Sequence, residues 1–160
     1  MVVVADSGPL HYLVLLDQVD LLHRFYGRVA VPDAVAAELQ SSGTPAAVSA
    51  WIGQPPSWVE ALPVASEAVL AVTEDLDPGE RSAIALAEIL HADLLRIDEA
   101  AGRAEAKRRC LRVTGTLGVL RAGAELGLVN VPDVMARLSA TSSYIDEALL
   151  KAVFERWMKP

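Results

Sequence analysis

Four carboxylates lie where the pattern of the sequence predicts buried helix faces or the open end of a sheet: Asp6, Glu38, Glu80 and Asp98. Asp6 directly follows the apolar run 2–5, and Asp98 directly follows the run 94–97. Short apolar runs of this kind predict parallel strands buried on both faces, and ligands bind at the carboxyl ends of such strands. We therefore expect both acids at the mouth of a sheet, although each one alone would also suit a helix N-cap.

The other two acids are predicted on the inward faces of helices. Glu38 ends a stripe that begins at Ala34, and Glu80 begins a stripe that continues to Ala87. A residue on such a stripe faces the sheet, where a carboxylate is unusual. For Glu80 a second interpretation stays open, because Asp77 precedes it with the spacing of a helix-capping box.

Grouped carboxylates in a partly desolvated cleft are costly, since burial and like charges both oppose ionisation. A divalent cation removes that conflict, and Mg²⁺, or Mn²⁺ in its place, prefers carboxylate and water ligands. The three histidines do not have the spacing of a zinc site. The sequence also lacks a phosphate-binding Gly-rich loop with Lys and a G-x-S-x-G nucleophile elbow.

Short apolar runs alternate with helical stretches along the chain, which predicts a three-layer α/β/α domain around a central parallel sheet. The expected strands are 2–5, 29–31, 58–62, 94–97 and 111–113. The expected helices are 13–25, 32–39, 78–90, 99–109 and 116–126, and one short helix is expected within 41–57. We expect one domain over 1–140, followed by a helical tail over 141–160 that packs on that domain or on a partner.

The composition fits a folded domain and excludes disorder, because 52% of the 160 residues are hydrophobic. The net charge is −7, but basic residues concentrate between Arg96 and Arg121, a pattern that suits either phosphate contact or a solvated helix face. The single cysteine, Cys110, is expected to be a small buried side chain in a reducing compartment. The first 16 residues lack a basic stretch and include Asp6 and Pro9, so we expect a cytoplasmic protein that does not enter a membrane.

Five segments in order resemble the PIN domain family over residues 2–130. They are Val-Val-Val-Ala-Asp6-Ser7-Gly-Pro-Leu, Val31-Pro32-x-x-Val35-x-x-Glu38-Leu39, Asp77-Pro78-Gly79-Glu80-x-x-Ala83-Ile84, Leu95-x-Ile97-Asp98-Glu99-x-x-x-Arg103 and Val113-Thr114-Gly115-Thr116-Leu117-Gly118. The last segment resembles the DUF3368 branch of that family. Two positions depart from the usual pattern, because Glu80 stands where most PIN domains have Asp and Glu99 stands where Asp is commoner in the branch.

The resemblance implies a Mg²⁺-dependent endoribonuclease, a hydrolase of phosphodiester bonds similar to the VapC toxins of VapBC-type toxin–antitoxin pairs. It further implies RNA as a partner, a small cognate antitoxin protein and a homodimer. A catalytically inactive PIN-like module that binds RNA or protein is the alternative, and it leaves the four inward acids unexplained.

Within the predicted nuclease site, Asp6, Glu80 and Asp98 are expected to hold one or two Mg²⁺ ions, with Glu38 completing the acidic pocket. Four further residues are candidates for substrate binding: Ser7, Arg103, Thr114 and Thr116. Arg103, one turn into the helix after Asp98, is the best candidate to hold a phosphate, and a salt bridge to Glu99 one helical turn earlier is the alternative.

Overall fold

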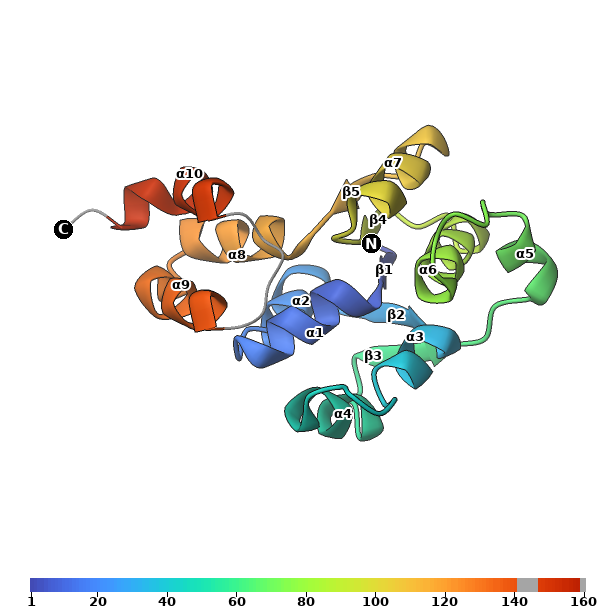
Figure 1. Cartoon of the computed structure of the whole chain (residues 1–160), viewed down its shortest axis with the longest axis horizontal. Coiled ribbons are helices and arrows are strands. Elements are labelled where there is room, and N and C mark those ends of the chain that lie inside the picture. The colour runs from blue at the N-terminus through green and yellow to red at the C-terminus, as the bar shows by residue number, and fades with distance from the viewer. Residues whose placement is uncertain (141–146, 159–160) are drawn as a thin grey trace. The chain divides into compact units, whose positions relative to one another are not determined.

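A computed structural model describes residues 1–140 and 147–158 of the chain (Figure 1). The chain divides into two compact units, 1–116 and 117–160, and the first holds the sheet. In the described part of the chain the sheet has the strand order β3-β2-β1-β4-β5, and every neighbouring pair is parallel. Its strands are β1 (Val3–Ala5), β2 (Val29–Pro32), β3 (Val59–Leu62), β4 (Leu94–Arg96) and β5 (Val113–Thr114).

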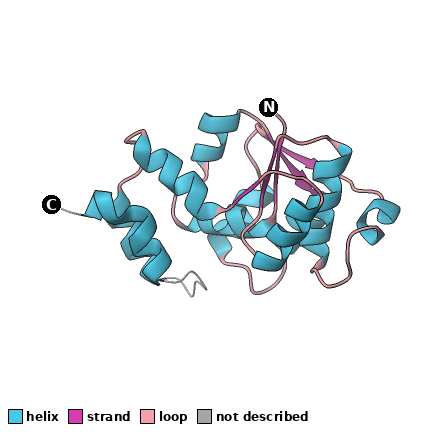
Figure 2. Ribbon diagram, turned by 90° about the horizontal axis from the view of Figure 1, so that it is seen from above, coloured by secondary structure: helices cyan, strands magenta, loops and turns pink. Residues whose placement is uncertain are grey.

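Helices connect the strands and flank the sheet, which confirms the predicted α/β fold (Figure 2). The helices of the first unit are α1 (Ser7–Leu15), α2 (Asp20–Tyr26), α3 (Asp33–Glu38), α4 (Ala46–Gly53), α5 (Ser66–Leu70), α6 (Pro78–Ile89) and α7 (Ala100–Arg108). Parallel neighbours require such crossover connections, because the chain must return to the same end of the sheet before each new strand.

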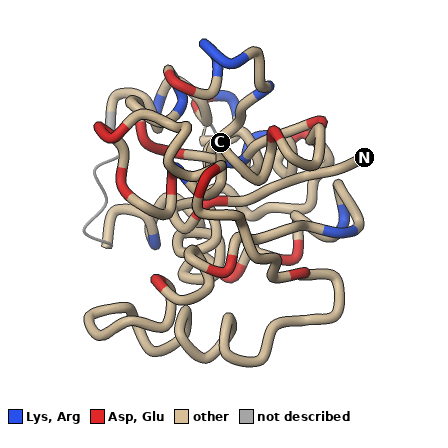
Figure 3. The backbone as a smooth tube through the Cα atoms, turned by 90° about the vertical axis from the view of Figure 1, so that its right-hand side faces the viewer, with Lys and Arg blue, Asp and Glu red and all other residues tan. Residues whose placement is uncertain are grey.

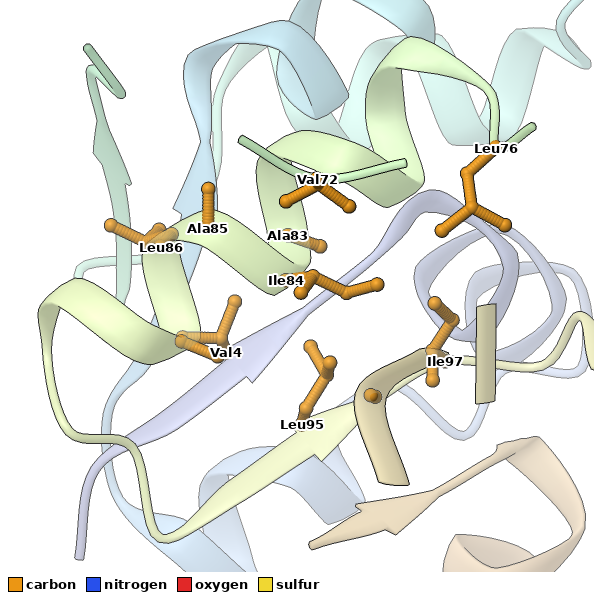
Figure 4. Close-up of a cluster of buried hydrophobic side chains, with 11 residues drawn as sticks. Val4, Val72, Leu76, Ala83, Ile84, Ala85, Leu86, Leu95 and Ile97 are labelled. Atoms are coloured by element: carbon orange, nitrogen blue, oxygen red, sulfur yellow. The ribbon is translucent and has the colours of Figure 1, made fainter. Parts of the chain in front are cut away.

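β1 lies at the centre of the sheet, and all three of its residues are buried, as its uniformly apolar sequence predicts. Val4 from β1 and Leu95 from β4 pack against Ile84 of α6 (Figure 4). Ile97, the residue after β4, belongs to the same buried cluster. Burying such aliphatic side chains contributes about 1.5–3 kcal/mol each. The packing therefore fixes α6 on the sheet, and with it the first turn of α6, where Glu80 lies.

The strand order brings the candidate acids to one edge of the sheet. β1 is followed by β2 on one side, whereas the chain reaches β4 on the other side of β1 only after β3. The order of strands thus reverses between β1 and β4, and in open parallel sheets this switch point is where ligands bind. Asp6 follows β1 directly and Asp98 follows β4 two residues after its end. The topology therefore explains why residues 92 positions apart in sequence approach the same region.

The helix expected over 13–25 is wrong in its bounds. α1 begins at Ser7 and ends at Leu15, and a separate helix, α2, begins at Asp20. Asp17 has a φ of 57°, a left-handed conformation that an α-helix cannot contain. Asp tolerates this conformation better than most residues, and the leucine periodicity across 13–22 concealed the break.

Two expected burials are also wrong. Cys110 is exposed, because it follows the end of α7 in a left-handed turn with a φ of 64°. The inward stripe expected on α3 is wrong as well, because Ala34 and Glu38 are both exposed and only Val35 of that stripe is buried. On α6, by contrast, the inward stripe from Glu80 to Ala87 is buried as predicted.

The basic segment at the end of α7 consists of residues 107–109 (top of Figure 3). Its two arginines form ion pairs with acidic side chains. The Arg109 guanidinium donates to Glu105 at 2.7 Å, to Glu88 at 2.6 Å and to the carbonyl of Ala71 at 2.7 Å. Arg108 donates to both carboxylate oxygens of Glu105, at 2.9 and 2.6 Å. Hydrogen bonds from Arg108 and Arg109 lower the pKa of Glu105 to about 2. These contacts join α7 to α6 and to the end of α5, so both arginines already have protein partners.

The second unit contains α8 (Thr116–Glu125), which starts at the last residue of the first unit, α9 (Val131–Ala140) and α10 (Glu147–Met158). α10 packs against α9. The helix expected in the tail is therefore present over Glu147–Met158, and positions 141–146 and 159–160 of that prediction lie outside the described residues. The boundary at 140 stays a prediction. Within the described ranges, none of the helices is long and apolar enough to span a membrane.

Candidate active site

Asp6 is the most buried acid at the carboxyl edge of the sheet. Its backbone amide donates to the carbonyl of Arg96 at 2.9 Å, which fixes the residue between β1 and β4. The side chain is 3% exposed, and its Oδ1 atom has no hydrogen-bond partner within the described part of the chain. Burial raises the pKa of Asp6 to about 8, against a lowering hydrogen bond from the Ser7 backbone, and nearby acids add to the rise. Asp6 is therefore a buried carboxyl group with one oxygen, Oδ1, that has no hydrogen-bond partner among the described residues.

The acids that raise the pKa of Asp6 come from two other elements: Asp77 and Glu80 at the start of α6, and Glu38 at the end of α3. The surroundings of Gly79 show how closely three of these four acids, Asp6, Glu38 and Asp77, approach one another. A Cβ atom built on Gly79 would lie 2.5 Å from Glu38 Oε2, 3.4 Å from Asp77 Oδ1 and 3.5 Å from Asp6 Oδ1. Carboxylate oxygens from three segments thus converge beside a residue without a side chain.

Glu80 combines the two roles that the sequence left open. Its backbone amide donates to Asp77 Oδ1 at 2.8 Å and its Oε2 accepts from the amide of Asp77 at 3.3 Å, so the capping box is present. The side chain is nevertheless 5% exposed, and burial followed by the charge of Asp77 raises its pKa to about 7. The charge of Glu99, the N-cap residue of α7, acts on Glu80 in the same direction.

Glu38 is exposed over most of its side chain, but its tip reaches the acids through the gap left by Gly79. Burial of its carboxyl group, then the charge of Asp77, raises the pKa of Glu38, and a hydrogen bond from the Ser7 side chain lowers it. Ser7, predicted to contact ligand or substrate, is thus placed against Glu38 at the beginning of α1.

Asp98 lies beside the start of α8. Its Oδ1 accepts from the amide of Thr116 and its Oδ2 from the Thr116 hydroxyl, each at 2.6 Å. Burial raises the pKa of Asp98, and Thr116 and Arg103 lower it. Asp98 Oδ2 also lies 3.1 Å from where a Cβ on Gly8 would stand. Both carboxylate oxygens of Asp98 therefore have hydrogen-bond donors, whereas Asp6 Oδ1 has none among the described residues.

Arg103 lies on α7 near Asp98, and its Nη1 donates to the carbonyl of Ile97 at 3.3 Å. Among the ion pairs of the described residues there is no Arg103–Glu99 bridge. Thr116 contacts Asp98 as described, whereas Thr114 is half-buried at the end of β5 and its carbonyl accepts from the amide of Ile97 at 3.0 Å. Arg103 and Thr116 thus border the Asp98 side of the site.

The donor set fits a hard divalent cation. As placed, no three Asp, Glu, His or Cys side chains of the described residues are close enough together to enclose an ion. Mg²⁺ does not need such a cage, because it keeps several waters and binds through one or two carboxylates. Asp6 Oδ1 supplies what such an ion requires, a buried oxygen with no other partner. Asp6, Glu38, Glu80 and Asp98 all have raised pKa values and carry the oxygen atoms that such an ion prefers as ligands.

The sequence interpretation missed Asp77 as a member of this group, because the capping-box spacing explained it fully. The signal that would have included it is position: an N-cap residue at the start of α6 lies at the same edge of the sheet as Asp6. Tyr12 was missed as well. Burial and then the charges of Asp98 and Glu99 raise the pKa of Tyr12, which places its ring close to those two acids.

Gly115 tests the arrangement around Asp98. A Cβ there would collide with Asp98 Oδ1 and lie 3.3 Å from the Ile97 carbonyl, so alanine must displace the acid from Thr116. We expect Gly115→Ala to lower the free energy of unfolding by about 1–3 kcal/mol, as overpacking does, measured by urea denaturation. Gly53→Ala is the control, since only the mobile end of Gln40 approaches that position, at 3.3 Å. Equal stability of the two variants would contradict the placement of Asp98.

The fold and the acids at its switch point are those of a PIN-type α/β domain, and the family comparison agrees. The DUF3368 family, described as a PIN domain, matches residues 2–159, and the chain belongs to this family. PIN domains are typically metal-dependent nucleases. No curated protein matches the chain.

Proposed function

We propose that this protein is a cytoplasmic, Mg²⁺-dependent endoribonuclease that hydrolyses phosphodiester bonds in RNA. The observation that carries the proposal is the unpartnered Oδ1 of Asp6, buried at the switch point of the sheet among acids that repel it. Such a group is unfavourable in a protein that has only to fold, and a bound cation removes the conflict. Membership of the PIN domain family supports the same reaction class.

In this proposal Asp6, Glu80 and Asp98 would hold Mg²⁺, or Mn²⁺ in its place, directly or through water. Glu38 completes the acidic pocket, and the Ser7 hydroxyl orients Glu38. The bound cation would lower the pKa of a water and offset charge on the phosphate. Thr116 holds Asp98 through two hydrogen bonds, so the orientation of that carboxylate is set before substrate binds.

The substrate contacts in this proposal are made by Ser7, Arg103, Thr114 and Thr116. Arg103 has a guanidinium beside Asp98 with one nitrogen on the Ile97 carbonyl, and its remaining donors suit a phosphate oxygen. The paired state of Arg108 and Arg109 leaves Lys107, which is exposed on the same helix, for contact with the RNA backbone.

The biological setting that we propose is a VapBC-type toxin–antitoxin pair, with this chain as the toxin, a small cognate antitoxin as its inhibitor and a homodimer as its working form. The support is the family membership. Co-expression with the protein encoded by the neighbouring gene tests it: a stable complex that suppresses cleavage is expected, and full cleavage in that complex contradicts the pairing.

Cleavage of RNA by the purified protein tests the enzyme. We expect cleavage with Mg²⁺, none with a chelator, and a loss of roughly 100-fold or more in Asp6→Asn, because its buried oxygen would contact the ion that activates water. Asp75→Asn is the matched control, since it removes an exposed acid from the loop before α6. Cleavage unchanged in Asp6→Asn would refute the assignment. RNA binding without cleavage in the wild type would favour the inactive binding module.

A further inference from the structure

We propose that Asp77 contributes its charge to the cation pocket, in addition to capping α6, because its Oδ1 lies beside Gly79 together with Asp6 Oδ1 and Glu38 Oε2. This inference rests on the proposed function, since it adds a residue to the group that holds the divalent cation. Capping alone needs only a hydrogen-bond acceptor, which Ser, Thr or Asn supplies as well as Asp. The two roles can therefore be separated.

The geometry places Asp77 inside the acidic group. The same Oδ1 that accepts from the Glu80 amide at 2.8 Å lies 3.4 Å from the built Cβ position of Gly79. Glu38 Oε2 and Asp6 Oδ1 lie 2.5 and 3.5 Å from the same position. The capping box uses only Oδ1 of Asp77, so the second oxygen of this exposed residue lies outside it. Asp77 is thus an exposed acid that lies beside the buried carboxyl group of Asp6.

Asp6 gives independent evidence that a ligand belongs at this point. Asp6 is only 3% exposed, and its Oδ1 has no hydrogen-bond partner in the described part of the chain. That unpartnered atom is the one directed at Gly79. A buried oxygen without a donor is unfavourable, and such an atom in a folded protein points to a bound ion or other ligand.

The charges around the pocket are not balanced by the protein. Asp77 takes part in none of the ion pairs of the described residues, and neither do Asp6, Glu38 and Glu80. After burial itself, the charge of Asp77 is a cause of the raised pKa of Asp6, Glu38 and Glu80 alike. Asp77 is therefore electrostatically coupled to each of the three groups, and a cation bound by any of them would also be attracted to Asp77.

The test is the affinity of the purified protein for Mn²⁺, measured by isothermal titration calorimetry and by the thermal shift that Mn²⁺ produces. Asp77→Asn keeps an oxygen acceptor for the Glu80 amide and removes the charge. We expect its affinity for Mn²⁺ to fall roughly tenfold, because a unit charge within a few ångströms of a divalent ion is removed. Asp75→Asn, in the same loop, is expected to bind Mn²⁺ as the wild type does. Circular dichroism checks that α6 is retained, and Asp77→Ser, a second cap with no charge, replaces Asp77→Asn if that variant does not fold.

The outcomes separate the two proposals. Wild-type affinity in both Asp77→Asn and Asp77→Ser, with clear binding by the wild type, would overturn the inference and leave Asp77 as a cap alone, with the nuclease proposal intact. Absence of Mn²⁺ binding by the wild type would instead overturn the proposed function, and this inference with it. A loss in the Asp77 variants that Asp75→Asn does not share supports both.

Discussion

Asp6→Asn is expected to stabilise the cation-free protein, and to do so more strongly as the pH rises. The pKa of Asp6 is raised from 3.8 to about 8, so the folded state binds this proton more tightly than the unfolded state does. Its contribution to stability is therefore largest at acid pH and is lost as the pH rises through about 8. Each pKa unit corresponds to about 1.4 kcal/mol, and after allowance for burying the amide we expect a gain of about 2–3 kcal/mol at pH 8.

The measurement is the melting temperature of wild type and variant with a chelator present, at pH 5 and pH 8. A gain of 2–3 kcal/mol corresponds to roughly 4–12 °C for a chain of this size, and it should be far smaller at pH 5. Mn²⁺ added at pH 8 should raise the melting temperature of the wild type and leave Asp6→Asn unchanged. A variant less stable than the wild type at pH 8 would contradict the view that Asp6 is an uncompensated charge, and Asp75→Asn controls for the loss of one acid.

The sequence predicted the sheet because its strands are short and mostly apolar, and three of them, β1, β2 and β4, form the centre of the sheet. The strand order could not be predicted in the same way, since β1 pairs with β2 and β4 through contacts distant in sequence. The failed helix over 13–25 has a local cause: one left-handed residue, Asp17, interrupts a periodic leucine pattern. Periodicity reports which faces are apolar and is insensitive to a single break.

For the site, the sequence correctly placed Glu80 on an inward stripe of α6, and it could not foresee how differently the acids are compensated. Asp98 has two hydrogen bonds from Thr116, whereas Asp6 Oδ1 has no partner among the described residues. That difference depends on which segment of the folded chain lies next to each acid, and for Asp98 this segment is the start of α8. The role of Gly79 could not be predicted from the sequence either, because the close approach of three carboxylate oxygens to this residue is visible only in the structure. The assignment of catalytic roles to these acids stays a prediction that the experiments above test.

Arg109→Met is expected to destabilise the fold more than any other change in the basic segment. The side chain of Arg109 is 20% exposed and donates hydrogen bonds to Glu105, Glu88 and the Ala71 carbonyl, so its loss removes contacts that link α7 to α6 and to the end of α5. Breaking such a partly buried network costs about 2–3 kcal/mol, measured by urea denaturation. Arg108→Met should cost less, because the Arg108 side chain is 68% exposed and Glu105 would keep Arg109.

The same variants distinguish a structural from an RNA-binding role for the basic segment. Arg109→Met, assayed well below its melting temperature, should bind RNA as the wild type does, because its donors already have protein partners. Lys107→Met should leave stability unchanged and weaken RNA binding at low salt, because an exposed cation contributes through phosphate contact. If Arg109→Met is fully stable and binds RNA weakly, the guanidinium exchanges its acidic partners for phosphate. The net charge of −7 would then understate how basic the nucleic-acid face becomes when RNA is bound.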